Sequence, residues 1–288
     1  MKSTISAITL AHFIVVVSLS LPLSINGESI FDSPHTEDLG GGYAQNELLG
    51  TFMVLVEGGT LEMSVGTHTV DTVYIGKHEV TWSEWQQVRS WAAANGYDIG
   101  DVGEGCADDH PVHSVSWFDV VKWSNAKSEM EGLAPVYTVD GVTYRSGESI
   151  PDKNLSANGF RLPLEAEWEF AARGGNQTKG YAYAGSNEYN EVGWNRANSM
   201  GGACDLRDGM GTWPVGQKEA NELGLYDMSG NLWEWCWDRV SDTSPYRRIR
   251  GGSWFDYGGG GRVSNRFDSR TDGRYFTSGF RLARTPSP

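Results

Sequence analysis

The chain has 288 residues, with 37 acidic and 23 basic side chains and a formal net charge of −14. A surface this acidic repels phosphate backbones and anionic lipid, so nucleic-acid binding is excluded from the functions we consider. The chain is long enough to bury a sizeable core. Its 37 Gly, 12 Trp, 12 Tyr and 10 Phe predict a loop-rich fold packed by aromatic side chains.

Near the N-terminus, the positively charged Lys2 is followed by an apolar run over residues 7–25. A short apolar run behind one positive charge is typical of a secretory signal peptide, which we expect to end near Gly27, so that residues 1–27 are removed. The protein is then exported, to the periplasm or the cell exterior. An uncleaved N-terminal membrane anchor is the alternative, because about 18 or more apolar residues can span a bilayer. No other segment is apolar enough to cross a membrane.

Residues 28–49 are polar and non-periodic, and we expect them to be a flexible leader. A single domain is expected over residues 50–288. It opens with two Val-rich, alternating stretches, residues 51–59 and 68–80, which predict strands. From Tyr181 onward the chain is mostly Gly, Asn, Asp and aromatic residues, which predicts irregular structure held by packing.

Three helices are predicted from capping residues and apolar spacing. Their ranges are residues 81–96, 116–132 and 162–175. Thr81 with Glu84, and Ser116 with Asp119, have the spacing of a capping box, and Gly96 and Gly132 end these helices. In the third helix, Pro163 lies near the first turn and Gly174 at the end. The residues expected on the buried faces are Trp85, Val88 and Trp91 in the first helix, and Leu164, Trp168 and Ala171 or Ala172 in the third.

Glu165, Glu167 and Glu169 raise the question of paired catalytic carboxylates. Residues two apart on a helix face different ways, and acidic residues in the first turns favour the helix dipole. We therefore expect these glutamates to be structural.

The three cysteines, Cys106, Cys204 and Cys236, allow one disulfide and one free thiol in an exported protein, and all three pairings remain open. There is no CxxC and no zinc-type spacing. His110 and His113 flank Pro111, so a shared helical face is not expected, and both are interpreted as structural.

Six motifs occur in one order along the chain. They are GKHEVTWSEW (76–85), HPVHSVSWFDVVKW (110–123), GFRLPLEAEWEFAARGG (159–175), GLYDMSGNLWEWCWD (224–238), RGGSW (250–254) and GFRLAR (279–284). Together they resemble the formylglycine-generating enzyme family, also called sulfatase-modifying factors, over residues 50–284. The resemblance implies a compact single α+β domain, a variant of the C-type lectin fold with little regular secondary structure.

Active members of this family oxidise a sulfatase cysteine to formylglycine with O₂, and hold copper(I) between two cysteines. Carried onto this sequence, these two positions are Asp256 and Gly261. Carboxylate oxygen is a poor ligand for copper(I), and glycine offers no side chain, so neither copper nor cysteine oxidation is expected. Ser253 matches the family's active-site serine, and its alternative role is that of a strand serine bonded to backbone. Cys236 is the thiol nearest in sequence.

The resemblance also implies structural calcium, in two sets of ligands. The first calcium set is Asp227, Gly230, Leu232 and Glu234, and the second calcium set is Asn198, Ser199, Asp208 and Met210. In the first set, two carboxylates and two backbone carbonyls around one turn suit an ion that takes six to eight oxygens. The second set needs a gap to align with the family, and the alternative for Asp227 and Glu234 is a turn cap and a surface acid.

Residues 254–278 combine aromatic, Gly, Ser and Asp residues with four arginines, Arg262, Arg266, Arg270 and Arg274. This composition is typical of a recognition surface, and arginines can grip carboxylates or sulfates by two hydrogen bonds. The stretch also resembles the variable segment of lectin-fold proteins diversified by retroelements. The expected ligand-binding residues are Trp254, Asp256, Tyr257, Arg262, Arg266 and Arg270. The alternative is that this stretch packs the C-terminal loops and pairs with the chain's own acids.

Three hypotheses follow. The first is an exported family member without the copper cysteines that acts as a binding or accessory protein, with a protein, glycan or sulfated ligand. The second is an enzyme that uses a different residue set or metal. The third is a lectin-fold receptor with a variable C-terminal surface.

Overall fold

The computed structural model describes residues 52–202, 204–241 and 243–286, which all belong to one structural unit. It confirms the predicted single α+β domain. The predicted signal peptide and the whole of the predicted leader lie outside the described residues. Within the described part of the chain, no helix is long and apolar enough to cross a membrane.

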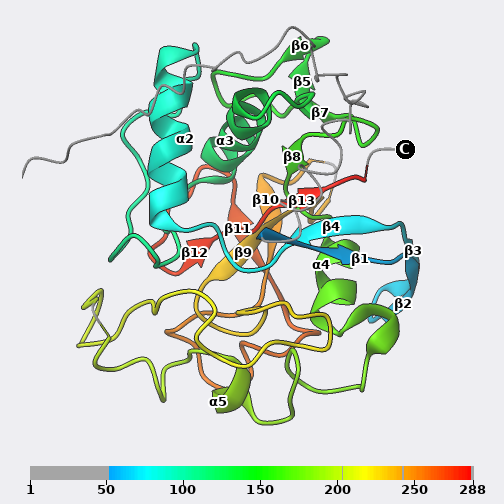
Figure 1. Cartoon of the computed structure of the whole chain (residues 1–288), viewed down its shortest axis with the longest axis vertical. Helices are drawn as coiled ribbons and strands as arrows, with labels where there is room; N and C mark the ends of the chain where they lie inside the picture. Colours follow the sequence, from blue (N-terminus) through cyan, green and yellow to red (C-terminus); the bar gives the residue numbers. More distant parts are fainter. Residues whose placement is uncertain (1–51, 203, 242, 287–288) are drawn as a thin grey trace, which may run out of the picture. The chain divides into compact units, whose positions relative to one another are not determined.

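Two four-stranded sheets organise the domain (Figure 1). The first has the order β1 (Met53–Val56), β4 (Val73–Gly76), β13 (Ala283–Arg284) and β8 (Phe160–Arg161). The second has the order β11 (Arg266–Arg270), β10 (Tyr246–Arg250), β9 (Trp233–Arg239) and β12 (Ser278–Gly279). Because β13 pairs antiparallel with both β4 and β8, the last motif of the chain closes the sheet that the first strands began.

There are also two smaller sheets among the described residues. One pairs β2 (Gly59–Met63) with β3 (Gly66–Val70), and the other has the order β6 (Val142–Thr143), β5 (Tyr137–Val139) and β7 (Asp152–Lys153). The first predicted strand is confirmed as β1, whereas the second divides into β3 and β4. The prediction of mostly irregular structure after Tyr181 is wrong for the part that holds β9 to β12. It holds for residues 193–202 and 204–232, the described part of the stretch before β9, which contain no helix or strand.

The three predicted helices are confirmed as α2 (Trp82–Ala94), α3 (Trp117–Met130) and α4 (Glu165–Ala172); the shorter η1 (Gly175–Gln177) and α5 (Tyr189–Val192) follow. At α3 the capping box is complete, since the side chains of Ser116 and Asp119 each bond the other's backbone N–H. At α2 the Thr81 hydroxyl accepts from the N–H of Glu84, but the Glu84 carboxylate pairs instead with Lys127, at 2.9 Å.

Two expected core positions differ from the structure. Trp91 is only partly buried, and Ala92 takes its place on the buried face of α2 beside Trp85 and Val88. Leu164 is only partly buried and precedes the first turn of α4. Its backbone N–H donates to the carboxylate of Glu167, the third residue of that helix. Trp168, Ala171 and Ala172 are buried as expected.

The three glutamates of α4 are buried and paired with arginines, which agrees with their structural interpretation. Glu167 binds both terminal nitrogens of Arg161, at 2.7 and 2.8 Å. Glu169 pairs with Arg250, and Glu165 pairs with Arg266. Because a buried carboxylate is tolerated only with its counter-charge, these ion pairs fix how α4 packs on β10 and β11.

Candidate functional site

The loop that follows β10 holds the RGGSW motif and both family cysteine positions. Gly251 and Gly252 have φ of +97° and +79°, which side chains rarely adopt. A Cβ at Gly252 would also lie 2.7 Å from the carbonyl carbon of Gly260. Glycine at 252 therefore lets residues 251–261 fold back against themselves, which brings the two family cysteine positions to one site.

Asp256, at the first cysteine position, is a hydrogen-bonded loop anchor. Its Oδ2 accepts from Trp233 Nε1 at 2.8 Å, from the N–H of Ser253 at 2.9 Å and from the Ser253 hydroxyl at 2.6 Å. The Ser253 hydroxyl is buried and accepts only the N–H of Phe255, at 3.3 Å. Both side chains hold the loop against β9. Ser253 lies after β10, and its hydroxyl donates to a side chain, so it differs from the strand serine bonded to backbone that the alternative describes.

Gly261, at the second cysteine position, lies under the ring of Tyr189 from α5. A Cβ at 261 would lie 2.3 Å from Tyr189 Cζ and 2.4 Å from its Oη. Tyr189 is buried and stacks on Tyr183, with ring centroids 4.7 Å apart and an angle of 3° between the planes. Its hydroxyl has no hydrogen-bond partner among the described residues, and burial raises its pKa. The space that a second thiolate needs is thus filled by an aromatic ring.

None of the three cysteines reaches this loop as an accessible thiol. Cys106 and Cys204 form a disulfide with a Cα–Cα distance of 5.3 Å, which resolves the pairing that the sequence left open. Cys236 is free but fully buried in β9, and burial raises the pKa of its thiol well above the usual value. It packs in the apolar core, where a thiolate is disfavoured.

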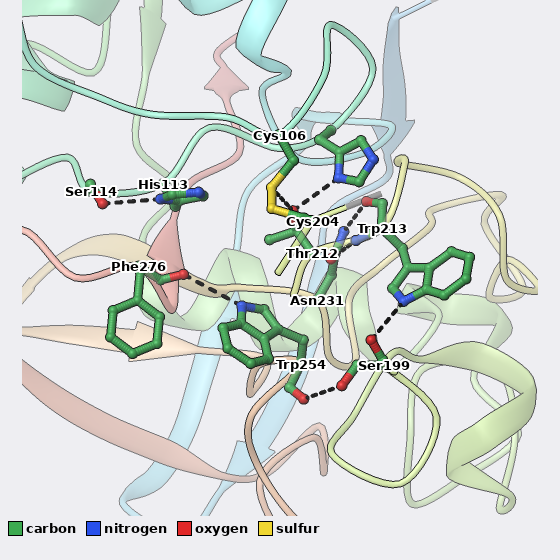
Figure 2. The surroundings of a disulfide bond; sticks show 11 residues. Cys106, His113, Ser114, Ser199, Cys204, Thr212, Trp213, Asn231, Trp254 and Phe276 are labelled. Atoms are coloured by element: carbon green, nitrogen blue, oxygen red, sulfur yellow. Dashed lines mark hydrogen bonds between the residues drawn. A yellow bond between two sulfur atoms is a disulfide. The ribbon is translucent and has the colours of Figure 1, made fainter. Parts of the chain in front are cut away.

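The surroundings of the disulfide include Trp254 of the 251–261 loop (Figure 2). It ties Cys204, in the irregular stretch 193–232, to the loop of Cys106. In the same stretch, Trp213 Nε1 donates to the carbonyl of Ser199 at 3.3 Å, and the Ser199 hydroxyl donates to the carbonyl of Trp254 at 3.0 Å. This series of bonds ties the backbone of Trp254, and with it the 251–261 loop, to the irregular stretch.

His110 and His113, both interpreted as structural from the sequence, are buried. His110 Nδ1 lies 3.0 Å from the Thr212 hydroxyl, and His113 Nδ1 lies 3.0 Å from the Ser114 hydroxyl. Burial lowers the pKa of His113 to about 4, so its ring is neutral at physiological pH.

The first calcium set contains a buried, partly unsatisfied carboxylate. Asp227 Oδ2 accepts the N–H of Gly216 at 2.7 Å, while Oδ1 is buried without a partner among the described residues. Burial raises the pKa of Asp227 to about 6. The sequence missed Glu79, which is also buried; its pKa rises well above normal because of burial and the charges of Asp227 and Glu234.

Glu234, the other carboxylate of this set, is fully buried and already engaged. Its two oxygens accept from Arg281 Nη2 and Nε, both at 2.6 Å, and Oε2 also accepts from Trp168 Nε1 at 2.6 Å. No group of three or more His, Cys, Asp or Glu side chains in the described ranges could hold a metal. Calcium here would therefore require backbone oxygens as well as the free Oδ1 of Asp227, which is the atom that fits the ion best.

In the second calcium set, the side chains and the Met210 carbonyl have protein partners or face solvent. The Asn198 side chain bonds the backbone of Asn195 at 2.7 Å, and the Ser199 hydroxyl is used by Trp254. The Asp208 carboxylate is 71% exposed beside Arg207. The Met210 carbonyl accepts two backbone N–H groups. Calcium at this set stays a prediction, without the buried, unpartnered carboxylate oxygen that Asp227 offers in the first set.

The predicted ligand-binding residues divide into two groups. Trp254 is fully buried, with its ring centroid 5.3 Å from that of Phe255 and 5.8 Å from that of Phe276. It therefore packs against these two rings and is not itself accessible to a ligand. Tyr257 is 73% exposed, and Arg262 is exposed with its guanidinium 5.6 Å from the Tyr183 ring centroid.

The other arginines of this stretch pair with acids of the chain, as the structural alternative expects. Arg266 binds Glu165, Arg270 binds Asp272 at 2.8 Å, and Arg274 binds Asp119 at 2.7 and 2.9 Å. Arg266 and Arg274 are thereby tied to α4 and α3, and they are not free to grip a ligand. Ligand contact by Tyr257, Arg262 and Arg270 stays a prediction.

Exposed aromatic side chains are concentrated in residues 255–276, in and after the 251–261 loop; we call this set the aromatic face. Its exposed members are Tyr257, Phe267, Tyr275 and Phe276, together with the partly exposed Phe255. Among the described residues, these four exposed aromatics lie within twenty residues of one another, against two elsewhere, Phe52 and Tyr246. The guanidiniums of Arg196 and Arg207 stack on Phe255, 4.3 and 5.0 Å from the ring centroid.

A separate hollow of about 950 Å³ lies among α2, α3 and the first sheet. None of the residues of the 251–261 loop lines it.

Comparison with known proteins identifies the same family as the sequence motifs. A family model for the sulfatase-modifying factor enzyme 1-like domain matches residues 43–286. The chain belongs to this family. The chaperone protein LppX of Paenibacillus barcinonensis is 36% identical over 240 residues, covering 73% of this chain and 80% of LppX. Inactive C-alpha-formylglycine-generating enzyme 2 of Bos taurus is 38% identical over 137 residues, covering 43% of this chain and 44% of that protein.

Solved structures share the fold of this family member. CarF superposes with a TM-score of 0.69 at 30% identity, covering 81% of this chain and 98% of CarF. Treponema denticola variable protein 1 superposes with a TM-score of 0.66 at 28% identity, covering 81% of this chain and 95% of that protein.

Proposed function

We propose that this chain is an exported accessory protein of the sulfatase-modifying factor family that binds another protein and does not oxidise cysteine with copper. One observation carries the proposal. Of the two positions where the family holds copper, one is an aspartate that accepts three hydrogen bonds, and the other is a glycine covered by Tyr189. Copper(I) needs soft thiolate ligands, and this site offers oxygen and an aromatic ring.

The relatives support an accessory role by their names. One is called a chaperone, and another is called an inactive member of the enzyme family. The aromatic face gives that role a surface, because aromatic and arginine side chains dominate the energetics of protein interfaces. Tyr257 at 73% exposure and Phe267 at 63% exposure are the members with most area to bury against a partner.

The absence of oxidase activity is tested directly. The mature chain, residues 28–288, is incubated in air with copper(I) and a cysteine peptide of sulfatase sequence, with an active formylglycine-generating enzyme as positive control. Mass spectrometry follows the conversion of the thiol to the aldehyde. We expect none, and aldehyde formation by this chain would refute the proposal.

The binding role is tested with an unfolding protein as the probe. The chain is added to heat-denatured citrate synthase, and aggregation is followed by light scattering. We expect suppression that falls at least about 3-fold in Tyr257→Ala/Phe267→Ala, since burial of each ring contributes on the order of 1–2 kcal/mol. Phe52→Ala is the matched control, because Phe52 is 60% exposed and lies outside the aromatic face. Equal activity of both variants would show that the aromatic face is not the binding surface.

A ligand receptor with a variable surface is the second candidate function. The likeness to Treponema denticola variable protein 1 favours it, as does the concentration of exposed aromatics in residues 257–276. Sequencing of near-identical gene copies decides between the two functions. Differences confined to residues 254–278 would favour the receptor, and uniform sequences there would favour the accessory protein.

We also propose that calcium binds at Asp227, with Glu234 and the carbonyls of Gly230 and Leu232 as further ligands. The buried, unpartnered Oδ1 of Asp227 supports this, and the ion would offset the excess of buried negative charge. Thermal unfolding is compared in CaCl₂ and in EGTA. We expect calcium to raise the Tm of the parent and of Asp208→Asn, and to leave that of Asp227→Asn unchanged. An equal shift in all three would argue against this site.

We also propose that residues 1–27 act as a signal peptide that directs export. The Cys106–Cys204 disulfide supports it, because disulfides persist in oxidising compartments. Fractionation of cells that express the full chain should recover the processed protein outside the cytoplasm.

A further inference from the structure

Arg247 of β10 is a buried arginine that lies outside the 251–261 loop. It is 1% exposed, and its guanidinium lies 3.9 Å from the ring centroid of Trp117 and 5.0 Å from that of Trp237. It also lines a pocket of about 770 Å³. We call this the Arg247 pocket; its walls are Ile150, Pro151, Asp152, Lys153, Trp237, Asp238, Arg239, Val240, Ser241 and Arg247.

One edge of this guanidinium has no hydrogen-bond partner. Nη1 donates to the carbonyl of Trp237, whereas Nε and Nη2 are buried and unpartnered among the described residues. These two nitrogens form the edge whose parallel N–H groups match the two oxygens of a carboxylate, sulfate or phosphate. A buried donor without a partner is costly, and here two such donors lie side by side.

Other arginines of the chain show what this edge does when an acid is present. Arg281 binds Glu234 through Nε and Nη2, both at 2.6 Å. Arg274 binds Asp119 through the same two nitrogens, at 2.7 and 2.9 Å. Arg247 differs from both in that no carboxylate of the described residues lies on this edge.

The walls of the pocket suit an anion in spite of the acidic chain. Three cationic residues and two carboxylates line it: Lys153, Arg239 and Arg247, against Asp152 and Asp238. Asp238 Oδ2 is already used by the N–H of Glu165, at 2.5 Å. Lys153 has no carboxylate partner within the described ranges, and its Nζ lies 5.1 Å from the ring centroid of Trp237.

We propose that the Arg247 pocket binds a small oxyanion, the carboxylate, sulfate or phosphate group of a ligand. The Nε–Nη2 edge of Arg247 holds two of its oxygens, and Lys153 contributes charge at the exposed wall. The site is independent of the aromatic face and of the family cysteine positions. Burial lowers the pKa of Arg247 to about 10, which agrees with a cation that has too little counter-charge.

Binding is measured by calorimetry on the mature chain, residues 28–288, with sodium sulfate, phosphate and acetate in turn at constant ionic strength. The order of the three affinities separates a tetrahedral group from a carboxylate. Crystals grown without these anions are then soaked in selenate, and anomalous scattering locates the ion. We expect one selenate within hydrogen-bonding distance of Arg247 Nε and Nη2. Absence of binding by all three anions, or selenate located only elsewhere, would overturn the proposal.

The variants separate this site from general salt effects. Arg247→Lys keeps the charge but loses the paired donors, so we expect sulfate affinity to fall at least about 10-fold. Because Arg247 packs between two indoles, its replacement can also disturb the fold. A second variant, Lys153→Gln on the exposed wall, avoids this, and we expect its sulfate affinity to fall about 3-fold. Lys179→Gln is the matched control, since Lys179 also lies over an aromatic ring, 5.9 Å from that of Tyr181, outside the pocket. Equal affinity of Lys153→Gln and Lys179→Gln would count against the site.

Discussion

Replacing Gly261 by alanine tests whether Tyr189 fills the second cysteine position. The added Cβ would lie 2.3 Å from Tyr189 Cζ, closer than real Cβ contacts come, so the ring or the loop must move. Overpacking of this kind costs about 1–3 kcal/mol in the free energy of unfolding. Removal of the ring in Tyr189→Ala costs about 3–5 kcal/mol by analogy with other large aromatic truncations. The double variant should lose no more than Tyr189→Ala alone, because the clash disappears with the ring.

The four proteins of this cycle are compared by urea unfolding, followed by tryptophan fluorescence. Gly259→Ala is the matched control, since Gly259 lies in the same loop and a Cβ there would meet nothing within 4 Å. We expect Gly259→Ala to unfold like the parent and Gly261→Ala to unfold at lower urea. A Gly261→Ala protein as stable as the parent, or effects that simply add in the double variant, would refute the reasoning. The second position would then be open, and a thiolate could occupy it.

Four further predictions concern buried groups. Tyr189→Phe should stabilise the protein by about 1 kcal/mol, seen as a higher urea midpoint, because the Tyr189 hydroxyl is buried without a partner. The folded state holds the pKa of His113 at about 4, below its ordinary 6.5. Stability should therefore fall by up to about 3 kcal/mol as the pH drops from 6.5 to 4, and His113→Gln should lack this part of the pH profile. Reduction of the Cys106–Cys204 disulfide, which spans 98 residues, should cost about 4–5 kcal/mol, measured with and without dithiothreitol. Glu234→Gln should cost about 3–5 kcal/mol in urea unfolding, because it leaves a buried arginine without its counter-charge.

Local signals in the sequence were sufficient for the helices. The Ser116 and Asp119 capping box and the apolar spacing of Trp85 and Val88 are set within one or two turns, and both appear as predicted. Strands of two residues, such as β12 and β13, are too short to show any alternation. They form because the neighbouring strand supplies their partners, and the sequence does not show which strand that is.

The site illustrates the same limit at longer range. The resemblance to the family identified Asp256 and Gly261 as the positions of the two cysteines. It could not show that Tyr189, from α5, covers Gly261, or that Arg274 pairs with Asp119 across 155 residues. The partner of a buried charge or the ring that fills a space is chosen by tertiary packing, which no short motif reports.

The filled cysteine position and the aromatic face are parts of one structure. Tyr183, which stacks on Tyr189, donates its hydroxyl to the carbonyl of Gly258 at 2.8 Å, and this holds the outer end of the loop that presents Tyr257. Asp256 accepts from Trp233, whose ring lies 5.9 Å from that of the exposed Phe267. Asp256, at the first cysteine position, and Tyr189, which covers the second, thus contact the residues that hold the exposed rings. Opening the site to admit a second thiolate in place of the Tyr189 ring should therefore loosen the loop that presents Tyr257.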